Sequence, residues 1–169
     1  EISFKLTPKP ANEKTVLAAF DNSKSCGDVA LSIFNGQVTP LALNVFDRGV
    51  LSATGMSNIE GEQYLAVRLG GMPRGLARMV DETIQASRAG GGTTIEIVDG
   101  GFALDLWRRI SDFGWVDQPP PEVVLRVSLV PNQVQIYIDA IKASLADNAP
   151  SFVASPGYGN VMVFWQSGN

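Results

Sequence analysis

The sequence contains no histidine and only one cysteine, Cys26, among its 169 residues. The absence of histidine excludes Ser-His-Asp and Cys-His nucleophile systems, and it excludes every histidine-ligated metal site. Any general acid or base within these residues must be Asp, Glu, Lys or Tyr. A single cysteine also excludes an internal disulfide, which favours a reducing cytoplasm.

Basic charge and long apolar runs are also lacking. The formal net charge is -4, so the chain has no basic surface excess of the kind that binds nucleic acid or anionic membranes. No apolar run approaches the roughly 20 residues that a membrane span requires. Neither the dinucleotide fingerprint nor the phosphate-loop pattern occurs in the sequence. With 45% hydrophobic residues, the chain is typical of a globular domain that buries its own core.

The first half of the chain has the pattern of a ferredoxin-like unit. Apolar periodicity predicts strands over 15–20, 39–46, 63–71 and 93–98, and helices over 22–34 and 73–88. We expect Asn22 or Ser23 to cap the first helix, and we expect Cys26 to be a buried core residue of its apolar face. The order is βαββαβ, which predicts a split βαβ unit over residues 13–100.

A second block follows over residues 101–169. It is predicted to contain a helix over 102–113, a strand over 122–131, a helix over 133–146 capped by Asn132, and strands over 150–155 and 160–165. The inward side of its first helix is either Leu104, Trp107 and Ile110, or Phe102, Leu106 and Ile110. This block lacks a last helix and strand, so we interpret it as incomplete. The predicted class is α+β, with antiparallel ferredoxin-like sheet and helices on one face.

Two arginines inside predicted strands are the candidate binding residues. Alternation places Arg68 opposite Leu65, Val67 and Leu69, and it places Arg126 opposite Val123, Leu125, Val127 and Leu129. A guanidinium held on a sheet face can bind a carboxylate or contact another domain, and the alternative for both arginines is plain exposure to water on an open sheet face. Trp165 is a third candidate, because its strand could lie at an edge. The carboxylates show no catalytic spacing, so no catalytic residue and no metal ligand is assigned.

Glycine-rich stretches mark turns at the boundaries of these elements. LGGMPRG (69–75) also precedes a helix, so an anion beside Arg74 is an alternative to an ordinary turn there.

The opening stretch, EISFKLTPKP, alternates apolar and polar residues like a half-buried strand that needs a partner. Its partner strand either lies later in this chain or has been cut away. This stretch resembles the segment that closes the flavin-binding domain in FAD-linked oxidases of the vanillyl-alcohol oxidase type, and the resemblance implies that residues 1–12 form a junction with a preceding flavin-binding domain. The residues that carry the resemblance are Glu1, Ile2, Ser3, Lys5, Leu6, Pro8, Lys9 and Pro10.

Later stretches are similar to the FAD-binding subunit of bacterial glycolate oxidase. They are AVRLGG (66–71), LWRRISDF (106–113), LRVSL (125–129) and MVFW (162–165). The family often has tryptophan before the arginine of the third stretch, where this chain has Leu125, while Arg126 is kept. The resemblance therefore implies the substrate, or cap, domain of a flavin-dependent oxidase or dehydrogenase of a small 2-hydroxy acid such as glycolate.

The same resemblance implies what lies outside these residues. A Gly-rich flavin domain would precede Glu1 and bind the FAD, and a histidine-bearing tail would follow Asn169, so no FAD contact is assigned here. Expected partners are that flavin domain, a second flavin subunit and an iron-sulfur subunit. The expected location is cytoplasmic, or membrane-associated through that complex. The rival hypothesis is a non-enzymatic ferredoxin-like module that binds a ligand or dimerises through its sheet.

Overall fold

A computed structural model describes residues 10–116, 120–145 and 149–166. Its strands are β1 (Asn12–Phe20), β2 (Ala42–Asp47), β3 (Gln63–Gly71), β4 (Gly92–Val98), β5 (Val123–Ser128), β6 (Ser151–Ser155) and β7 (Asn160–Trp165). Its helices are α1 (Ser23–Asn35), α2 (Arg48–Ala53), α3 (Pro73–Ala89), α4 (Gly100–Asp112) and α5 (Val134–Ser144), with short 3-10 turns η1 (Pro131–Gln133) and η3 (Pro156–Tyr158). The strand predicted over residues 1–7 lies outside the described residues.

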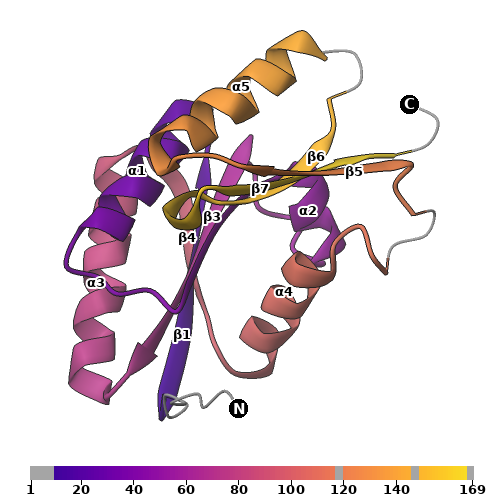
Figure 1. The fold of residues 1–169 in the computed structure, drawn as a ribbon. Coiled ribbons are helices and arrows are strands. Elements are labelled where there is room, and N and C mark those ends of the chain that lie inside the picture. The colour runs from indigo at the N-terminus through magenta and orange to yellow at the C-terminus, as the bar shows by residue number, and fades with distance from the viewer. Residues whose placement is uncertain (1–9, 117–119, 146–148, 167–169) are drawn as a thin grey trace, which may run out of the picture.

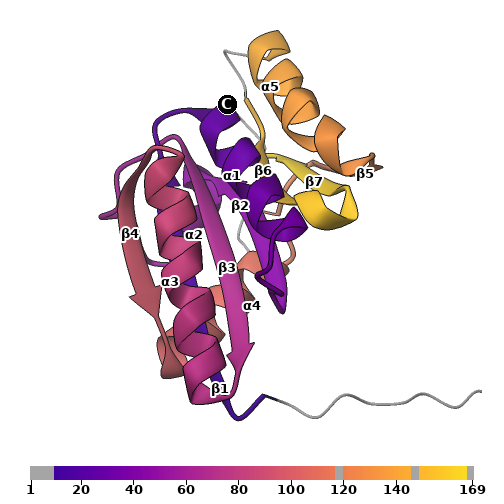
Figure 2. The same ribbon diagram turned by 90° about the vertical axis from the view of Figure 1, so that its left-hand side faces the viewer.

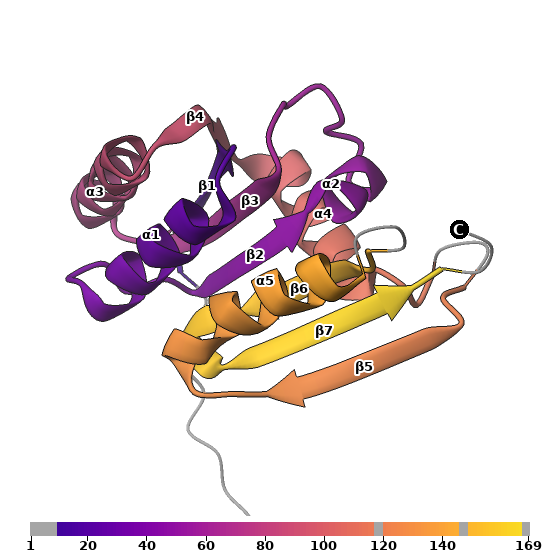
Figure 3. The ribbon, with the colours of Figure 1, turned by 90° about the horizontal axis from the view of Figure 1, so that it is seen from above.

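All seven described strands form one antiparallel sheet, in the order β4-β1-β3-β2-β6-β7-β5 (Figure 3). The first four strands have the order of a ferredoxin-like unit. The other three strands repeat part of this order: β5 corresponds to β1 of the first unit, β7 to β3, and β6 to β2. The two units join where β2 pairs with β6, through Val45 opposite Ala154 and Phe46 opposite Val153. The predicted α+β class with an antiparallel sheet is confirmed.

Helices cover both faces of this sheet (Figures 1 and 2). The first face carries α1, α3 and α5 over a core that includes Val16, Leu65 and Val67. The second face carries α2 and α4 over residues such as Leu17 and Tyr64. The sequence pattern predicted helices on one face only, and this part of the prediction is wrong, because α2 and α4 cover the second face. Its signal was the continuous apolar run in β1, which is typical of a strand buried on both faces.

Local signals account for most helix boundaries. Asn22 caps α1 as predicted, since its Oδ1 accepts a hydrogen bond of 2.9 Å from the Ser25 N–H. The predicted cap at Asn132 is wrong, because residues 131–133 form the turn η1 and α5 begins without a side-chain cap. Helix α2 was not predicted at all. It begins where Asp47 Oδ1 accepts from the Val50 N–H at 3.0 Å.

Helix α4 presents neither of the two predicted inward sets. Its buried residues are Leu106, Trp107 and Ile110. Phe102 and Leu104 are 85% and 55% exposed, because the side of α4 that packs on the sheet runs through Ala103, Leu106, Trp107 and Ile110. Ile110, which belongs to both predicted sets, is buried. So are Trp107 of the first set and Leu106 of the second. Cys26 is fully buried in α1, as predicted.

The turn between β6 and β7 requires glycine at position 159. Gly159 has a φ of 64°, and a Cβ there would lie 1.7 Å from the Leu129 carbonyl oxygen. We therefore expect Gly159→Ala to lower the free energy of unfolding by at least about 2 kcal/mol, measured by urea denaturation. Gly101→Ala in α4 is the matched control, because a Cβ there meets nothing within 4 Å. That control should leave stability unchanged or raise it by about 0.5–1 kcal/mol, and equal losses in both variants would contradict the prediction.

Candidate functional site

Arg68 and Arg126 both lie on the second face of the sheet, as alternation predicted. They are not close together, because Arg68 lies on β3 and Arg126 on β5, with β2, β6 and β7 between them. Four strand spacings correspond to roughly 19 Å. The second face therefore holds two separate polar regions, one around each arginine.

The first region is built around an ion pair between Arg68 and Glu13. Arg68 donates to Glu13 Oε2 from Nε at 2.8 Å and from Nη2 at 2.5 Å. The two side chains are 29% and 20% exposed, so the pair is largely shielded from water. Glu13 was not singled out by the sequence analysis. Alternation along β1 could have identified Glu13, because Glu13, Thr15 and Leu17 follow one another at every second position and so share one side of the strand.

A cavity of about 200 Å³ lies beside this pair. Its walls are Pro10, Ala11, Glu13, Thr15, Arg68, Gly100, Ala103, Leu104 and Trp107. Trp107 of α4 donates from Nε1 to Thr15 Oγ1 at 2.8 Å, and both residues are buried. Trp107 was predicted to be a packing residue; in addition, its hydrogen bond ties α4 to strand β1.

The second region is a row of polar side chains across β2, β6, β7 and β5. Its members, in cross-strand order, are Asn44, Ser155, Asn160 and Ser128. Ser155 Oγ donates to Asn44 Oδ1 at 2.7 Å, and Arg126 Nε donates to Asn160 Oδ1 at 3.0 Å. Arg126 itself is exposed, so its remaining N–H groups face solvent. Such a surface offers donors and acceptors to a carboxylate, a hydroxyl group or a polar surface of another domain.

Trp165 does not join either region. It alternates with Phe164, which packs in the second-face core, so Trp165 points to the first face and packs there half-buried. The three predicted candidates are therefore not brought together. Arg68 and Arg126 lie in separate regions of the second face, and Trp165 lies on the first face.

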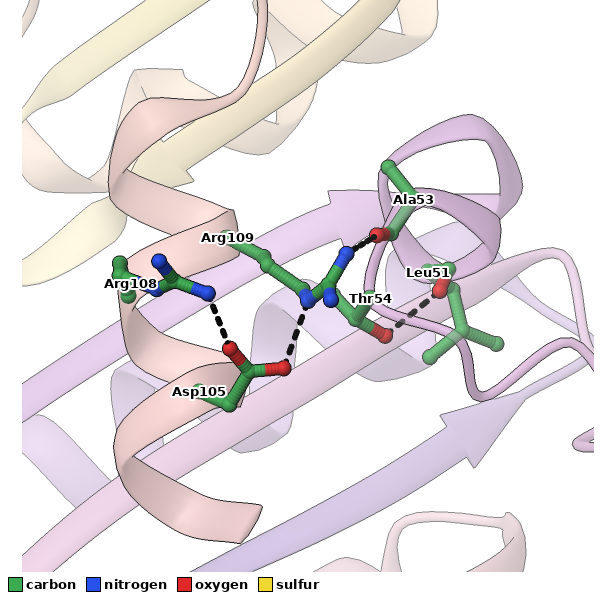
Figure 4. Close-up of polar contacts among 6 residues, drawn as sticks. All are labelled: Leu51, Ala53, Thr54, Asp105, Arg108 and Arg109. Carbon is green, nitrogen blue, oxygen red and sulfur yellow. Dashed lines mark hydrogen bonds and ion pairs between the residues drawn. The ribbon is translucent and has the colours of Figure 1, made fainter. Parts of the chain in front are cut away.

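A cluster of charged side chains joins α4 to α2 (Figure 4). Asp105 accepts from Arg108 and, at 2.6 Å, from Arg109 Nε, while Arg109 Nη1 also donates to the Ala53 carbonyl at 3.2 Å. The hydrogen bonds from Arg109 and then Arg108 lower the pKa of Asp105. The bonds of Asp105 stay within α4, so the hydrogen bond from Arg109 to the Ala53 carbonyl is the contact by which this cluster reaches α2.

Burial also shifts the pKa values of groups away from this cluster, among them Cys26 and Asp47. Burial raises the pKa of the Cys26 thiol to about 12, which makes it unreactive at neutral pH. Burial likewise raises the pKa of the Asp47 carboxyl to about 6, opposed by hydrogen bonds from the Val50 N–H and the Ser151 hydroxyl and by the charge of Lys142. Within the described parts of the chain, no group of three or more Cys, Asp or Glu residues is placed to hold a metal ion. No described helix is long and apolar enough to cross a membrane.

Comparison with known proteins finds similarity of structure. No protein-family model and no curated protein sequence matches the chain. Among solved structures, it is similar to p-cresol methylhydroxylase, with a TM-score of 0.58 and 10% identity over 96% of this chain. It is also similar to alkyldihydroxyacetonephosphate synthase, with a TM-score of 0.58 and 14% identity over 92% of this chain. The chain spans only 41% and 36% of those two proteins, and at these identities the similarity establishes the fold.

The bond between Trp107 and Thr15 can be tested by substitution. Trp107→Phe removes the donor and leaves the buried Thr15 hydroxyl without it, so we expect the free energy of unfolding to fall by about 2 kcal/mol. Trp115→Phe is the matched control, because Trp115 is 65% exposed and should tolerate the change. The measurement is chemical denaturation followed by far-UV circular dichroism, and a Trp107→Phe variant as stable as the control would contradict this role.

Asp47 predicts a specific dependence of stability on pH. Its pKa rises from 3.8 to about 6 on folding, so the folded state keeps the proton longer than the unfolded state. The free energy of unfolding should therefore fall as pH rises from about 4 to 6 and then level off. Asp47→Asn stays neutral and retains a side-chain oxygen for the α2 cap. The difference in stability between the wild type and this variant should follow that pH window, and a difference that is constant with pH would show that Asp47 does not titrate there.

Proposed function

We propose that this chain is the cap domain of an FAD-linked oxidase or dehydrogenase that acts on a small 2-hydroxy acid such as glycolate. The observation that carries the proposal is the similarity of its fold to p-cresol methylhydroxylase across 96% of the chain. The resemblance of residues 1–10 to the segment that leaves a flavin domain in such oxidases supports the same assignment.

The FAD belongs, in this proposal, to another domain of a longer polypeptide. The sequence contains no dinucleotide fingerprint, so no flavin site is assigned to these residues on that pattern. The cavity beside Arg68, at about 200 Å³, is smaller than ordinary ligand sites of about 300–1,000 Å³. A cavity of about 430 Å³ beside α4 is lined by Glu96 and Asp99, whose carboxylates would repel the diphosphate of FAD.

The role of this chain is then to bind and orient. A flavin supplies redox chemistry, and the protein around it supplies binding, orientation and electrostatics. Arg126 is the first candidate for the substrate carboxylate or for the domain interface, because its guanidinium is exposed beside the polar row of Asn44, Ser155, Asn160 and Ser128. Arg68 comes second, since Glu13 already occupies two of its donors. Trp165 is proposed only as an interface residue, on the opposite face.

Partners and location follow from the sequence resemblance. We propose a flavin domain on the same polypeptide, a second flavin subunit, and an iron-sulfur subunit that accepts the electrons. Such a complex would be cytoplasmic, or attached to the membrane through one of its other subunits.

Substitution of Arg126 in the full-length protein tests the site. If Arg126 binds the substrate carboxylate, Arg126→Ala should lower kcat/KM for the 2-hydroxy acid by about tenfold to a hundredfold, the value of one charge-assisted hydrogen bond. Arg126→Lys should recover only part of the loss, because lysine cannot form the bidentate pair. Arg88→Ala, at an exposed position near the end of α3, is the matched control.

The rival function, a non-enzymatic ferredoxin-like module, predicts a different outcome. The purified full-length protein would then show no flavin absorbance and no oxidation of glycolate or related acids. If the present proposal is right, the full-length protein is yellow and the isolated 169-residue chain is colourless. Flavin that co-purifies with the isolated chain would contradict the assignment of the FAD to another domain.

A further inference from the structure

A small cavity lies where β4 ends beside β1. Strand β4 stops at Val98, which pairs with Thr15. The chain then enters α4, so Glu13, two residues nearer the start of β1, has no residue of β4 beside it. The space at this point is the cavity of about 200 Å³ next to the Arg68 ion pair. Its walls are formed by β1 and the two residues before it, by β3 and by α4.

The polar groups on these walls have hydrogen-bonding capacity that no described residue uses. Arg68 bonds to Glu13 through Nε and Nη2, and both bonds go to Oε2, so Arg68 Nη1 and Glu13 Oε1 remain unbonded within the described parts of the chain. Thr15 Oγ1 accepts from Trp107, but its own O–H has no acceptor among the described residues, although Thr15 is only 1% exposed. A buried hydroxyl ordinarily uses its donor as well. The cavity therefore presents a cationic donor, a hydroxyl donor and an anionic acceptor.

The wall that α4 contributes leaves room for a small molecule. Ala103 and Leu104 give it an apolar surface. A Cβ on Gly100 would meet nothing within 4 Å, so the space at the first turn of the helix is open. Liquid water takes about 30 Å³ per molecule, so a cavity of this volume holds roughly six or seven non-hydrogen atoms. That is too few for a flavin and matches a molecule of the size of alanine or serine.

We propose that this cavity binds a small zwitterionic 2-amino acid, of the size of alanine or serine. The carboxylate of the amino acid accepts hydrogen bonds from Arg68 Nη1 and from the Thr15 hydroxyl. Its ammonium group donates to Glu13 Oε1, and its short side chain lies against Ala103 and Leu104. Each unused polar group of the cavity then has a partner of the complementary type.

The charges of the ion pair favour a zwitterion over a simple acid or amine. Arg68 and Glu13 together carry no net charge, so a zwitterion places each of its charges beside the opposite charge. A 2-hydroxy acid would bring its carboxylate close to Glu13 with no cation to offset the repulsion. The larger cavity beside α4 lacks this balance, because its charged lining residues are Glu96, Asp99 and Asp105. The proposed site requires neither a flavin nor turnover, so it does not depend on the proposed function.

Filling the cavity tests its location. In isothermal titration calorimetry of the full-length protein, we expect L-alanine and L-serine to bind with dissociation constants of about 10 µM to 1 mM, a range open to ligands of so few atoms. Ala103→Leu occupies the cavity without removing a polar group, so it should weaken this binding by about tenfold or more. Ala140→Leu, at an exposed position of α5, is the matched control and should bind like the wild type. No binding of either amino acid at about 10 mM, or equal affinity in the two variants, would overturn the proposal.

Changing the charges tests the class of ligand. Glu13→Gln keeps an acceptor for Arg68 but removes the charge that faces the ammonium, so the affinity for L-alanine should fall by about tenfold or more. Glu82→Gln is the matched control, because Glu82 also accepts from an arginine, Arg78 Nη1 at 2.8 Å, on α3. L-Lactate has a hydroxyl group in place of the ammonium, so any lactate binding should be the same in the wild type and in Ala103→Leu. Unchanged alanine affinity in folded Glu13→Gln, or lactate binding that falls with Ala103→Leu as far as alanine binding does, would overturn the proposal.

Discussion

The pairing of β2 with β6 is the interaction on which the rest of the structure depends. Only two residue pairs, Val45 with Ala154 and Phe46 with Val153, join the two units in the described ladder. Through them, alternating residues on seven strands form two continuous faces, and each face can take a shared layer of helices. Side chains reinforce the junction, because Ser155 of β6 donates to Asn44 of β2. Helix α1 of the first unit also packs against α5 of the second.

Cover of the second face decides where a binding surface can exist. Helix α4 and helix α2 bury the aromatic and aliphatic part of that face, and the bonds of Trp107 to Thr15 and of Arg109 to Ala53 hold them in place. Two regions with polar side chains remain accessible there: the cavity beside the Arg68 ion pair and the row next to Arg126. These are the parts of the chain that can contact a small acid or another domain.

Much of the fold could be predicted from local pattern. The strand expected over 63–71 is β3, Gln63–Gly71, and the helix expected over 73–88 is α3, Pro73–Ala89. Both have strong periodicity and a clear proline or glycine boundary. Helix α2 was missed because a six-residue helix has little periodicity, and its buried Val50 and Leu51 are explained only by the second-face core. The Glu13 partner of Arg68 was missed because the two residues are 55 positions apart and meet only when β1 pairs with β3.

The sequence by itself determined the strands and the longer helices, the side of its strand that each arginine occupies, and the chemistry that the lack of histidine excludes. Those properties depend on residues a few positions apart, because helix and strand periods are local. Only the tertiary structure decided that Arg68 and Arg126 lie far apart on the same face, that Trp165 lies on the other, and that helices cover both faces. Strand order and helix placement are set by backbone pairing and burial between residues distant in sequence, and a local pattern carries no record of which strands become neighbours.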